Sequence, residues 1–230
     1  MLHKTRGIVL NYIKYRETSV IARIYTESFG VQSYIINSIR SQRSKKGLAL
    51  LQPLTILEMV VYHNANKPDG LNRISEYKPA YHFSSIPFDV KKSTMAMFIT
   101  ELLFKTLQEE EHHGAVFEFL VEYILTLDQK LDQFENLHVY LLVQLTHYLG
   151  FGIHYRRELE NDQALHRTNE NRLKMYDKII ELNDNKINES MILSNGMRKE
   201  ILDYMVDYYT KHIEGFKGMK SLDILSQIFR

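Results

Sequence analysis

The spacing of apolar residues changes once along this chain, and that change restricts the folds that the chain can adopt. Up to about residue 80, apolar and polar residues tend to alternate, which is the pattern of a β-strand with one buried face. From about residue 89, apolar residues recur every three or four positions, as they do on one side of an α-helix. We therefore predict an α+β protein of two domains, a β-rich domain at residues 1–80 and an all-helical domain at residues 81–230.

Five segments of the first domain have the length and β-branched content of strands. They lie at residues 6–14, 19–28, 31–39, 54–62 and 71–77. Gly30 separates the second segment from the third, as a hairpin turn requires, and Pro53 precedes the fourth, where its missing N–H group does little harm. Five strands predict an OB-fold β-barrel. Residues 40–51 predict a basic loop and a short helix that caps the barrel.

The second domain contains apolar faces of helical spacing. They lie at residues 95–107, 117–125, 137–149, 199–213 and 221–228. We expect Gly150 and Gly152 to end the third helix and Ser221 to cap the last one. Residues 153–195 are polar with weak periodicity, which predicts a long, partly ordered insertion.

The composition excludes several functional classes. Without cysteine, the chain cannot form a disulfide, a thiolate zinc site or a cysteine nucleophile. No apolar run approaches the roughly 18 residues that span a bilayer, and the N-terminal residues do not resemble a signal peptide, so we expect a cytoplasmic protein without membrane contact. The phosphate-loop, dinucleotide-binding and common hydrolase motifs are missing from the sequence. We predict a protein that is not an enzyme and needs no cofactor.

The charges are divided unevenly along the chain. Residues 1–80 contain 12 Lys or Arg and 5 Asp or Glu, a net charge of +7, whereas the remaining residues contain 17 and 23, a net charge of −6. This asymmetry favours a first domain that faces a polyanion such as nucleic acid.

The basic residues of the first domain are therefore candidate DNA-binding residues. Four of them fall in one predicted loop and can contact several adjacent phosphates: Arg40, Arg43, Lys45 and Lys46. Five others extend along the predicted strands: Lys4, Arg6, Lys14, Arg16 and Arg23. The alternative is that these cations only make the surface soluble.

Tyrosines of the predicted strands are candidates for base stacking. Tyr12, Tyr25 and Tyr34 would each offer an aromatic face to a base if the ring were exposed. The alternative for each ring is a place in the barrel core.

Acidic and histidine residues do not suggest a metal site. Glu109–Glu111 and His112–His113 are consecutive, and consecutive residues on a helix point in different directions. His147, His154 and His166 lack a cysteine or a well-spaced carboxylate that would complete a zinc site. We predict no metal.

Several motifs, in their order and spacing, resemble one protein family. In the first domain they are KTRGIVL at residues 4–10, IYTESFG at 24–30 and LQPLTILE at 51–58. In the second they are FITELL at 98–103, LTHYLGF at 145–151 and KSLDIL at 220–225. These motifs are similar to those of the RecO recombination mediators over nearly the whole chain, except for residues 153–195. Many members carry a four-cysteine zinc site, so this chain resembles a zinc-less, Bacteroidetes-like variant.

The resemblance implies partners that the residues alone do not give. RecO-like proteins bind single- and double-stranded DNA, anneal complementary strands without ATP, and bind the acidic C-terminal tail of single-stranded-DNA-binding protein. They also join RecR to help load RecA, which implies a location at the nucleoid. The resemblance further implies a tail pocket on the first two helices, with these candidate residues: Phe98, Leu102, Lys105, Phe117 and Leu120.

Two other functions remain open on the sequence. One is an OB-fold protein adaptor that does not bind DNA. The other is a metal-dependent nuclease that uses carboxylates such as Glu17, Glu27 or Glu58, although these residues form no visible acidic cluster.

Overall fold

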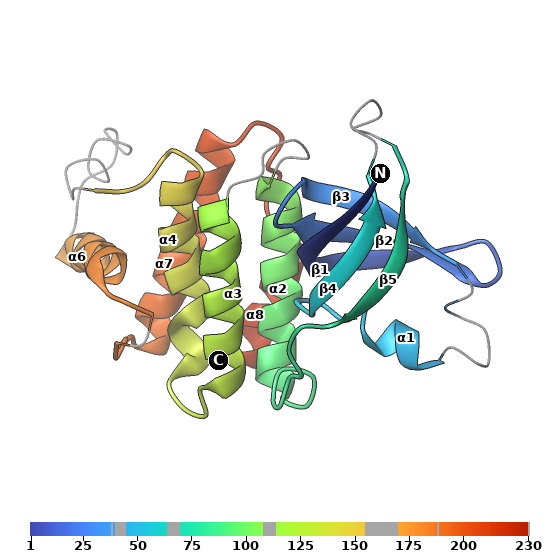
Figure 1. The fold of residues 1–230 in the computed structure, drawn as a ribbon. Coiled ribbons are helices and arrows are strands. Elements are labelled where there is room, and N and C mark those ends of the chain that lie inside the picture. Colours follow the sequence, from blue (N-terminus) through green and yellow to red (C-terminus); the bar gives the residue numbers. More distant parts are fainter. Residues whose placement is uncertain are drawn as a thin grey trace. The chain divides into compact units, whose positions relative to one another are not determined.

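The computed structural model describes residues 1–37, 39, 45–63, 70–107, 114–154, 170–187 and 189–229, with the backbone alone for Lys45 and Lys46. The chain forms two compact units, which we call the N-terminal unit (Met1–Ile124) and the C-terminal unit (Leu125–Arg230). The N-terminal unit holds a five-stranded barrel, and the C-terminal unit is helical (Figure 1). The predicted α+β class with an N-terminal OB-fold barrel is confirmed.

The barrel consists of β1 (Leu2–Tyr15), β2 (Ser19–Thr26), β3 (Gly30–Ile36), β4 (Ile56–Tyr62) and β5 (Asn72–Pro79). It closes in the order β1-β2-β3-β5-β4 (Figure 1). Neighbouring strands are antiparallel except β3 and β5, which pair in parallel only at Tyr34 with Asn72 and Ile35 with Arg73. A hydrogen bond of 2.9 Å from the Asn72 side-chain amide to the Gln32 side-chain oxygen lies buried beside this seam.

The barrel core follows from the alternation that the sequence shows. The buried side chains of one cluster are Val9, Val20, Ala22, Ile24, Tyr34, Ile36, Ile39, Leu51, Leu57, Met59, Val61 and Ile74. Helix α1 (Lys45–Ala49) lies between β3 and β4 in the chain (Figure 1). Its Leu48 packs against this core. The short helix expected between the third and fourth strands is therefore present.

Local geometry shifts some strand ends away from the predicted positions. β1 begins at Leu2 because its first half pairs with β4, from Leu2 opposite Tyr62 to Ile8 opposite Ile56. Leu54 has a positive φ of 65°, so the chain turns there and β4 begins only at Ile56. Gly30, with φ of 63°, starts β3 at the predicted hairpin turn.

The N-terminal unit also contains α2 (Val90–Thr106) and α3 (Gly114–Gln129) as far as Ile124. The Asp89 side chain accepts a hydrogen bond from the Lys92 backbone N–H and caps the start of α2. One face of α2 is buried, and α2 packs beside β1. The first predicted helical segment is thus a helix that adjoins the barrel.

The C-terminal unit consists of a 3₁₀ turn, η2 (Phe134–Asn136), and the helices α4 (Leu137–Tyr148), α6 (Glu170–Asp184), α7 (Asn195–His212) and α8 (Ser221–Ile228). Helix α4 is buried on most sides and packs against α6 and α7. It ends before Gly150, which has a positive φ of 83° and suits the predicted helix stop.

Two expectations for this unit are corrected by the structure. Ser221 does not cap α8, because the capping position is Lys220, which makes no side-chain capping bond. Helix α6 lies within the segment predicted to be a polar insertion of weak periodicity, where it buries Met175, Ile179 and Leu182 at helical spacing. In the described part of the chain, no helix is both long and apolar enough to cross a membrane.

Candidate nucleic-acid interface

Two exposed candidate cations lie at the β1–β2 turn, with Lys14 near the end of β1 and Arg16 in the turn itself. Lys14 pairs with Val20 in the barrel, and Val20 pairs with Ile36 at the end of β3. The side chains of Ser19 and Asn37 also form a hydrogen bond of 3.2 Å. The turn therefore lies beside the point where the chain leaves β3 toward residues 40–46, which we call the basic segment.

The basic segment itself falls largely outside the described residues. Arg40 and Arg43 are not described, and neither are the side chains of Lys45 and Lys46. The positions that flank the segment are attached to the barrel, since Asn37 bonds to Ser19 and Leu48 of α1 packs on the core. Asn37 and Leu48, on either side of the segment, are thus held at the barrel, and Asn37 lies beside the end of the β1–β2 turn.

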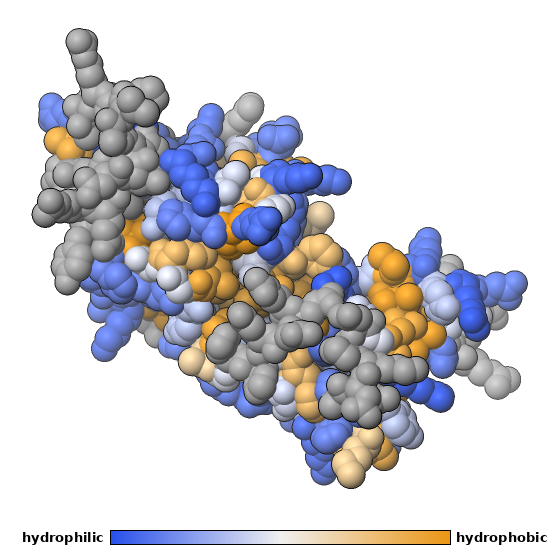
Figure 2. Space-filling view, turned by 90° about the horizontal axis from the view of Figure 1, so that it is seen from above, coloured by the Kyte–Doolittle hydropathy of each residue, from blue (hydrophilic) through white to orange (hydrophobic). Residues whose placement is uncertain are grey.

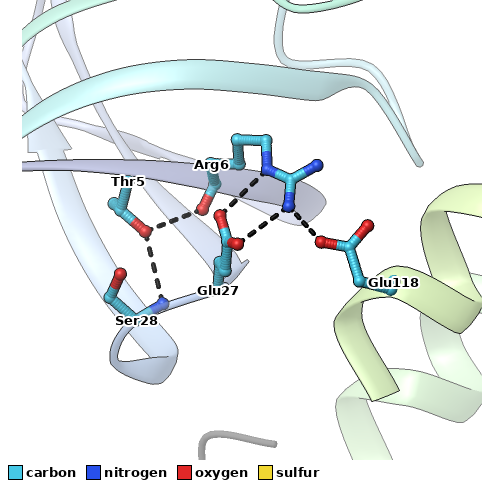
Figure 3. A network of polar contacts seen from close by, with 5 residues as sticks. All are labelled: Thr5, Arg6, Glu27, Ser28 and Glu118. Atoms are coloured by element: carbon cyan, nitrogen blue, oxygen red, sulfur yellow. Dashed lines mark hydrogen bonds and ion pairs between the residues drawn. The ribbon is translucent and has the colours of Figure 1, made fainter. Parts of the chain in front are cut away.

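Arg6 is surrounded by carboxylates. Its Nε and Nη2 atoms donate hydrogen bonds of 2.9 and 2.8 Å to the two carboxylate oxygens of Glu27, and Nη2 also contacts Glu118 of α3 (Figure 3). The hydrogen bonds with Glu27 raise the pKa of Arg6, and the same bonds lower the pKa of Glu27. The positive charge of this guanidinium is therefore already balanced by carboxylates of the protein itself.

The surface around Arg6 carries both signs of charge. A groove of about 570 Å³ there includes Lys4 and Lys78 together with Glu58 and Glu76. Lys78 Nζ lies 2.8 Å from Glu58 Oε2. Lys4 and Arg6 therefore belong to a mixed-charge face, which is less suited to a polyanion than a surface of positive charge alone.

Arg23 lies in a third environment, beside helix α2. Its guanidinium lies 4.7 Å from the centre of the Phe104 ring of α2, which is the geometry of a cation–π contact. Among the described residues, the candidate cations therefore separate into the β1–β2 turn, the mixed-charge face and the edge of α2. The sequence did not distinguish these three environments.

Two of the three candidate stacking tyrosines are inside the barrel. Tyr25 is 1% exposed and Tyr34 is 0% exposed, so neither ring offers a face to a base, and burial raises the pKa of Tyr34. The prediction of base stacking is corrected for these two residues, because their positions on β2 and β3 point inward. Tyr12 is 36% exposed and lies on the outer side of β1.

The candidate tail pocket is also corrected. Phe98, Leu102, Phe117 and Leu120 are each 0% exposed, so these side chains do not line an open pocket. Phe117 lies beneath the Arg6 guanidinium, 5.1 Å from ring centre to Cζ. Lys105 is only partly exposed, and its Nζ lies 3.4 Å from Glu101 Oε1. Apolar helix faces of this kind form cores more often than binding sites.

The residues weighed as metal ligands are only partly described. Glu109–Glu111, His112, His113 and His166 lie outside the described residues. The rings of His147 and His154 are 5.0 Å apart, and His147 contacts the Asn183 side chain. Within the described part of the chain, no group of three or more His, Cys, Asp or Glu residues is placed to hold a metal ion.

A groove in the N-terminal unit was not predicted from the sequence. This groove, of about 360 Å³, lies between β1 and α2, and we call it the β1–α2 groove; its lining includes Tyr12, Pro53, Met97 and Phe104. Met97 is 51% exposed and Phe104 is 39% exposed. They are seven residues apart on α2, so they lie on the same side of the helix, and that side is not its predicted apolar face. This spacing of two large apolar residues could have indicated the groove from the sequence.

Two family models match the chain one after the other. The model of the recombination protein O N terminal matches residues 1–83, which include the whole barrel. The model of the recombination protein O C terminal matches residues 87–169, which begin just before α2.

Relatives match along nearly the full length of the chain. The DNA repair protein RecO of Flavobacterium psychrophilum is 36% identical, with 98% of each chain covered. The DNA repair proteins RecO of Phocaeicola vulgatus and Bacteroides fragilis are both 32% identical, with 100% of each chain covered. These names describe a DNA repair protein and include no enzymatic activity. The chain belongs to the RecO family of DNA repair proteins.

Proposed function

We propose that this chain binds single- and double-stranded DNA and anneals complementary strands without ATP. Together with RecR it helps to load RecA onto DNA that is coated by single-stranded-DNA-binding protein, whose acidic C-terminal tail it binds. Membership of the RecO family and the exposure of Lys14 and Arg16 at the β1–β2 turn support this function. We place this function in the cytoplasm, at the nucleoid.

The observation that carries the proposal is the position of the β1–β2 turn. Lys14 lies near the end of β1 and Arg16 in the turn, and this turn ends at Ser19, which bonds to Asn37 where the chain leaves β3 toward Arg40, Arg43, Lys45 and Lys46. Six cations in two adjoining segments can neutralise several successive phosphates. Neutralisation lowers the repulsion between two strands, and the base edges stay free to pair.

We assign a smaller part to Lys4 and Arg6. A phosphate that approached Arg6 would have to displace two hydrogen bonds to Glu27 and would meet the negative charge of Glu118. A guanidinium that already contacts carboxylates gains little free energy from a further anion. The main phosphate contacts therefore lie at the β1–β2 turn and the basic segment.

Charge reversal tests this assignment. We expect a Lys14→Glu and Arg16→Glu double variant, and an Arg43→Glu, Lys45→Glu and Lys46→Glu triple variant, to bind DNA more weakly. Mobility shifts at several salt concentrations should also show a flatter salt dependence, since the slope counts the phosphates that are neutralised. A Lys174→Glu and Lys217→Glu variant is the matched control, because both lysines are exposed and belong to the C-terminal unit rather than to the barrel. Unchanged slopes in both test variants would remove these segments from the interface.

The partner function needs a separate experiment. Strand annealing is measured on DNA coated with intact single-stranded-DNA-binding protein and on DNA coated with the tail-deleted form. We expect annealing only with the intact tail. A protein adaptor that does not bind DNA would show no mobility shift even at the lowest salt concentration. A nuclease would cleave labelled DNA when magnesium is added, but Glu27 and Glu58 are already paired with Arg6 and Lys78.

A further inference from the structure

We infer that the β1–α2 groove holds an unpaired base of single-stranded DNA, with the rings of Phe104 and Tyr12 as stacking surfaces. This inference rests on the proposed DNA binding and adds a subsite that selects single strands. The groove lies entirely in the N-terminal unit, between one strand of the barrel and the helix beside it.

The groove exposes large apolar side chains. Tyr12, Met97 and Phe104 each reach solvent, and Pro53 contributes a further apolar wall. Figure 2 shows one face of the molecule, on which hydrophobic patches interrupt a largely hydrophilic surface. Exposed apolar side chains that share a hollow mark a binding site more often than isolated ones do. The volume of about 360 Å³ is sufficient for a planar base against these side chains.

The charges around the groove favour a nucleic acid. The Arg23 guanidinium lies over one face of the Phe104 ring, 4.7 Å from its centre, so we expect a base to stack on the face that this guanidinium leaves open. Glu101 is the carboxylate of the groove, and its charge is offset by Lys105, with Nζ and Oε1 3.4 Å apart. The carboxylate of the groove is thus partly neutralised, which lowers its repulsion for the phosphate that follows a bound base.

The direction of β1 connects the groove to the cationic turn. Lys14 is two residues beyond Tyr12 on the same strand, so the two Cα atoms are about 7 Å apart at the usual rise of a strand. Arg16 follows in the turn. A single strand with one base in the groove can thus lay its next phosphates along Lys14 and Arg16.

Base stacking also explains why the site would prefer single strands. In a duplex both faces of each base are covered by its neighbours, whereas an unpaired base can place a face on an aromatic ring. Stacking tolerates any base, so the subsite has no sequence preference.

The test compares Phe104→Ala and Tyr12→Ala with the unaltered full chain. Affinities for an oligothymidylate and for a duplex of equal length are measured by fluorescence anisotropy at several salt concentrations. We expect each variant to lose about 5- to 100-fold in single-strand affinity and to keep its salt slope, because no phosphate contact is removed. Duplex affinity should stay the same. Phe88→Ala is the control, since Phe88 is 80% exposed and does not line the groove.

Two further measurements isolate the stacking. Phe104→Tyr keeps an aromatic face and should retain single-strand affinity, whereas Phe104→Leu keeps apolar volume without that face and should lose it. An oligonucleotide with abasic sites should bind the unaltered chain as weakly as it binds Phe104→Ala. Circular dichroism verifies that each variant is folded.

Failure of the inference differs from failure of the proposed function. If both alanine variants bind the oligothymidylate as tightly as the unaltered chain, or lose single-strand and duplex affinity equally, the groove is not a stacking site. If they weaken only the binding of a protein-tail peptide, the groove belongs to a protein partner and the inference is wrong. If the unaltered chain binds neither DNA at the lowest salt concentration, the proposed function itself fails.

Discussion

The guanidinium of Arg6 donates two parallel hydrogen bonds to the carboxylate of Glu27, at 2.9 and 2.8 Å. The two residues are 21 positions apart in the chain and lie on β1 and directly after β2. Bidentate pairs of this kind fix the orientation of both side chains. Part of the positive charge of the first 80 residues is therefore already neutralised within the barrel.

Removal of this ion pair should weaken the fold in a pH-dependent way. Because both side chains are about one-third exposed, we expect Glu27→Gln to lower the free energy of unfolding by only about 1 kcal/mol near pH 7. Arg6 lowers the pKa of Glu27 from its usual 4.5, so this contribution is present above pH 4.5 and is lost as the pH falls through the folded value. Urea unfolding of both proteins at pH 7 and pH 4 measures the difference, with the exposed Glu17→Gln as control. An equal difference at the two pH values would contradict the pairing.

The buried His138 should make the protein less stable in acid. Burial, with a smaller contribution from Arg198, lowers the pKa of His138 from 6.5 to about 3. Between these values the unfolded chain binds a proton that the folded chain does not, so stability falls as the pH decreases from 6.5. The loss is at most about 1.4 kcal/mol per pH unit. We expect His138→Phe to flatten this slope in unfolding curves at pH 7, 6 and 5, and equal slopes would refute the explanation.

Helix α6 should contribute to the core in spite of its polar sequence. Ile179 is 0% exposed, so we expect Ile179→Ala to lower the free energy of unfolding by about 2–4 kcal/mol. Lys174→Ala on the exposed side of the same helix should change it by less than about 0.5 kcal/mol. Denaturant titration of the two variants compares the faces directly. If Ile179→Ala is as harmless as Lys174→Ala, α6 does not pack as the structure shows.

Gly7 should not tolerate a side chain. A Cβ atom there would lie 2.5 Å from Met59 Cε and 2.6 Å from Ile24 Cγ2, inside the barrel. We expect Gly7→Ala to lower the free energy of unfolding by about 1–3 kcal/mol through overpacking. Gly196→Ala, with no atom within 4 Å of the new Cβ, should be neutral or slightly stabilising in thermal unfolding. A stable Gly7→Ala protein would mean that Met59 and Ile24 can both move aside.

The barrel could be predicted from the sequence because its signals are local. Strand alternation, the turn at Gly30 and the position of Pro53 each involve only neighbouring residues. The environment of the functional side chains is not local. Glu118, which contacts Arg6, is 112 residues away in the chain, so nothing in the sequence indicated that Arg6 would face carboxylates.

The burial of the strand tyrosines could not be predicted for the same reason, because it depends on residues that are distant in the chain. An aromatic residue in a strand faces inward or outward according to register, and register depends on the partner strand. Tyr25 and Tyr34 face inward, whereas Tyr12 follows an irregularity in pairing between Val9 and Asn11 and lies outside. Helix α6 was missed because its few apolar residues are separated by many charged ones, although their spacing is helical.

The two-residue seam between β3 and β5 is the shortest strand pairing of the barrel. If that seam is parted, the remaining pairings still join all five strands as a continuous antiparallel sheet, in the order β3-β2-β1-β4-β5. Closure into a cylinder adds few backbone bonds to such a sheet, so we expect this seam to open more readily than the other strand pairings. The amide protons of β5 on this edge should then exchange with solvent sooner than those of β1, which is bonded on both sides.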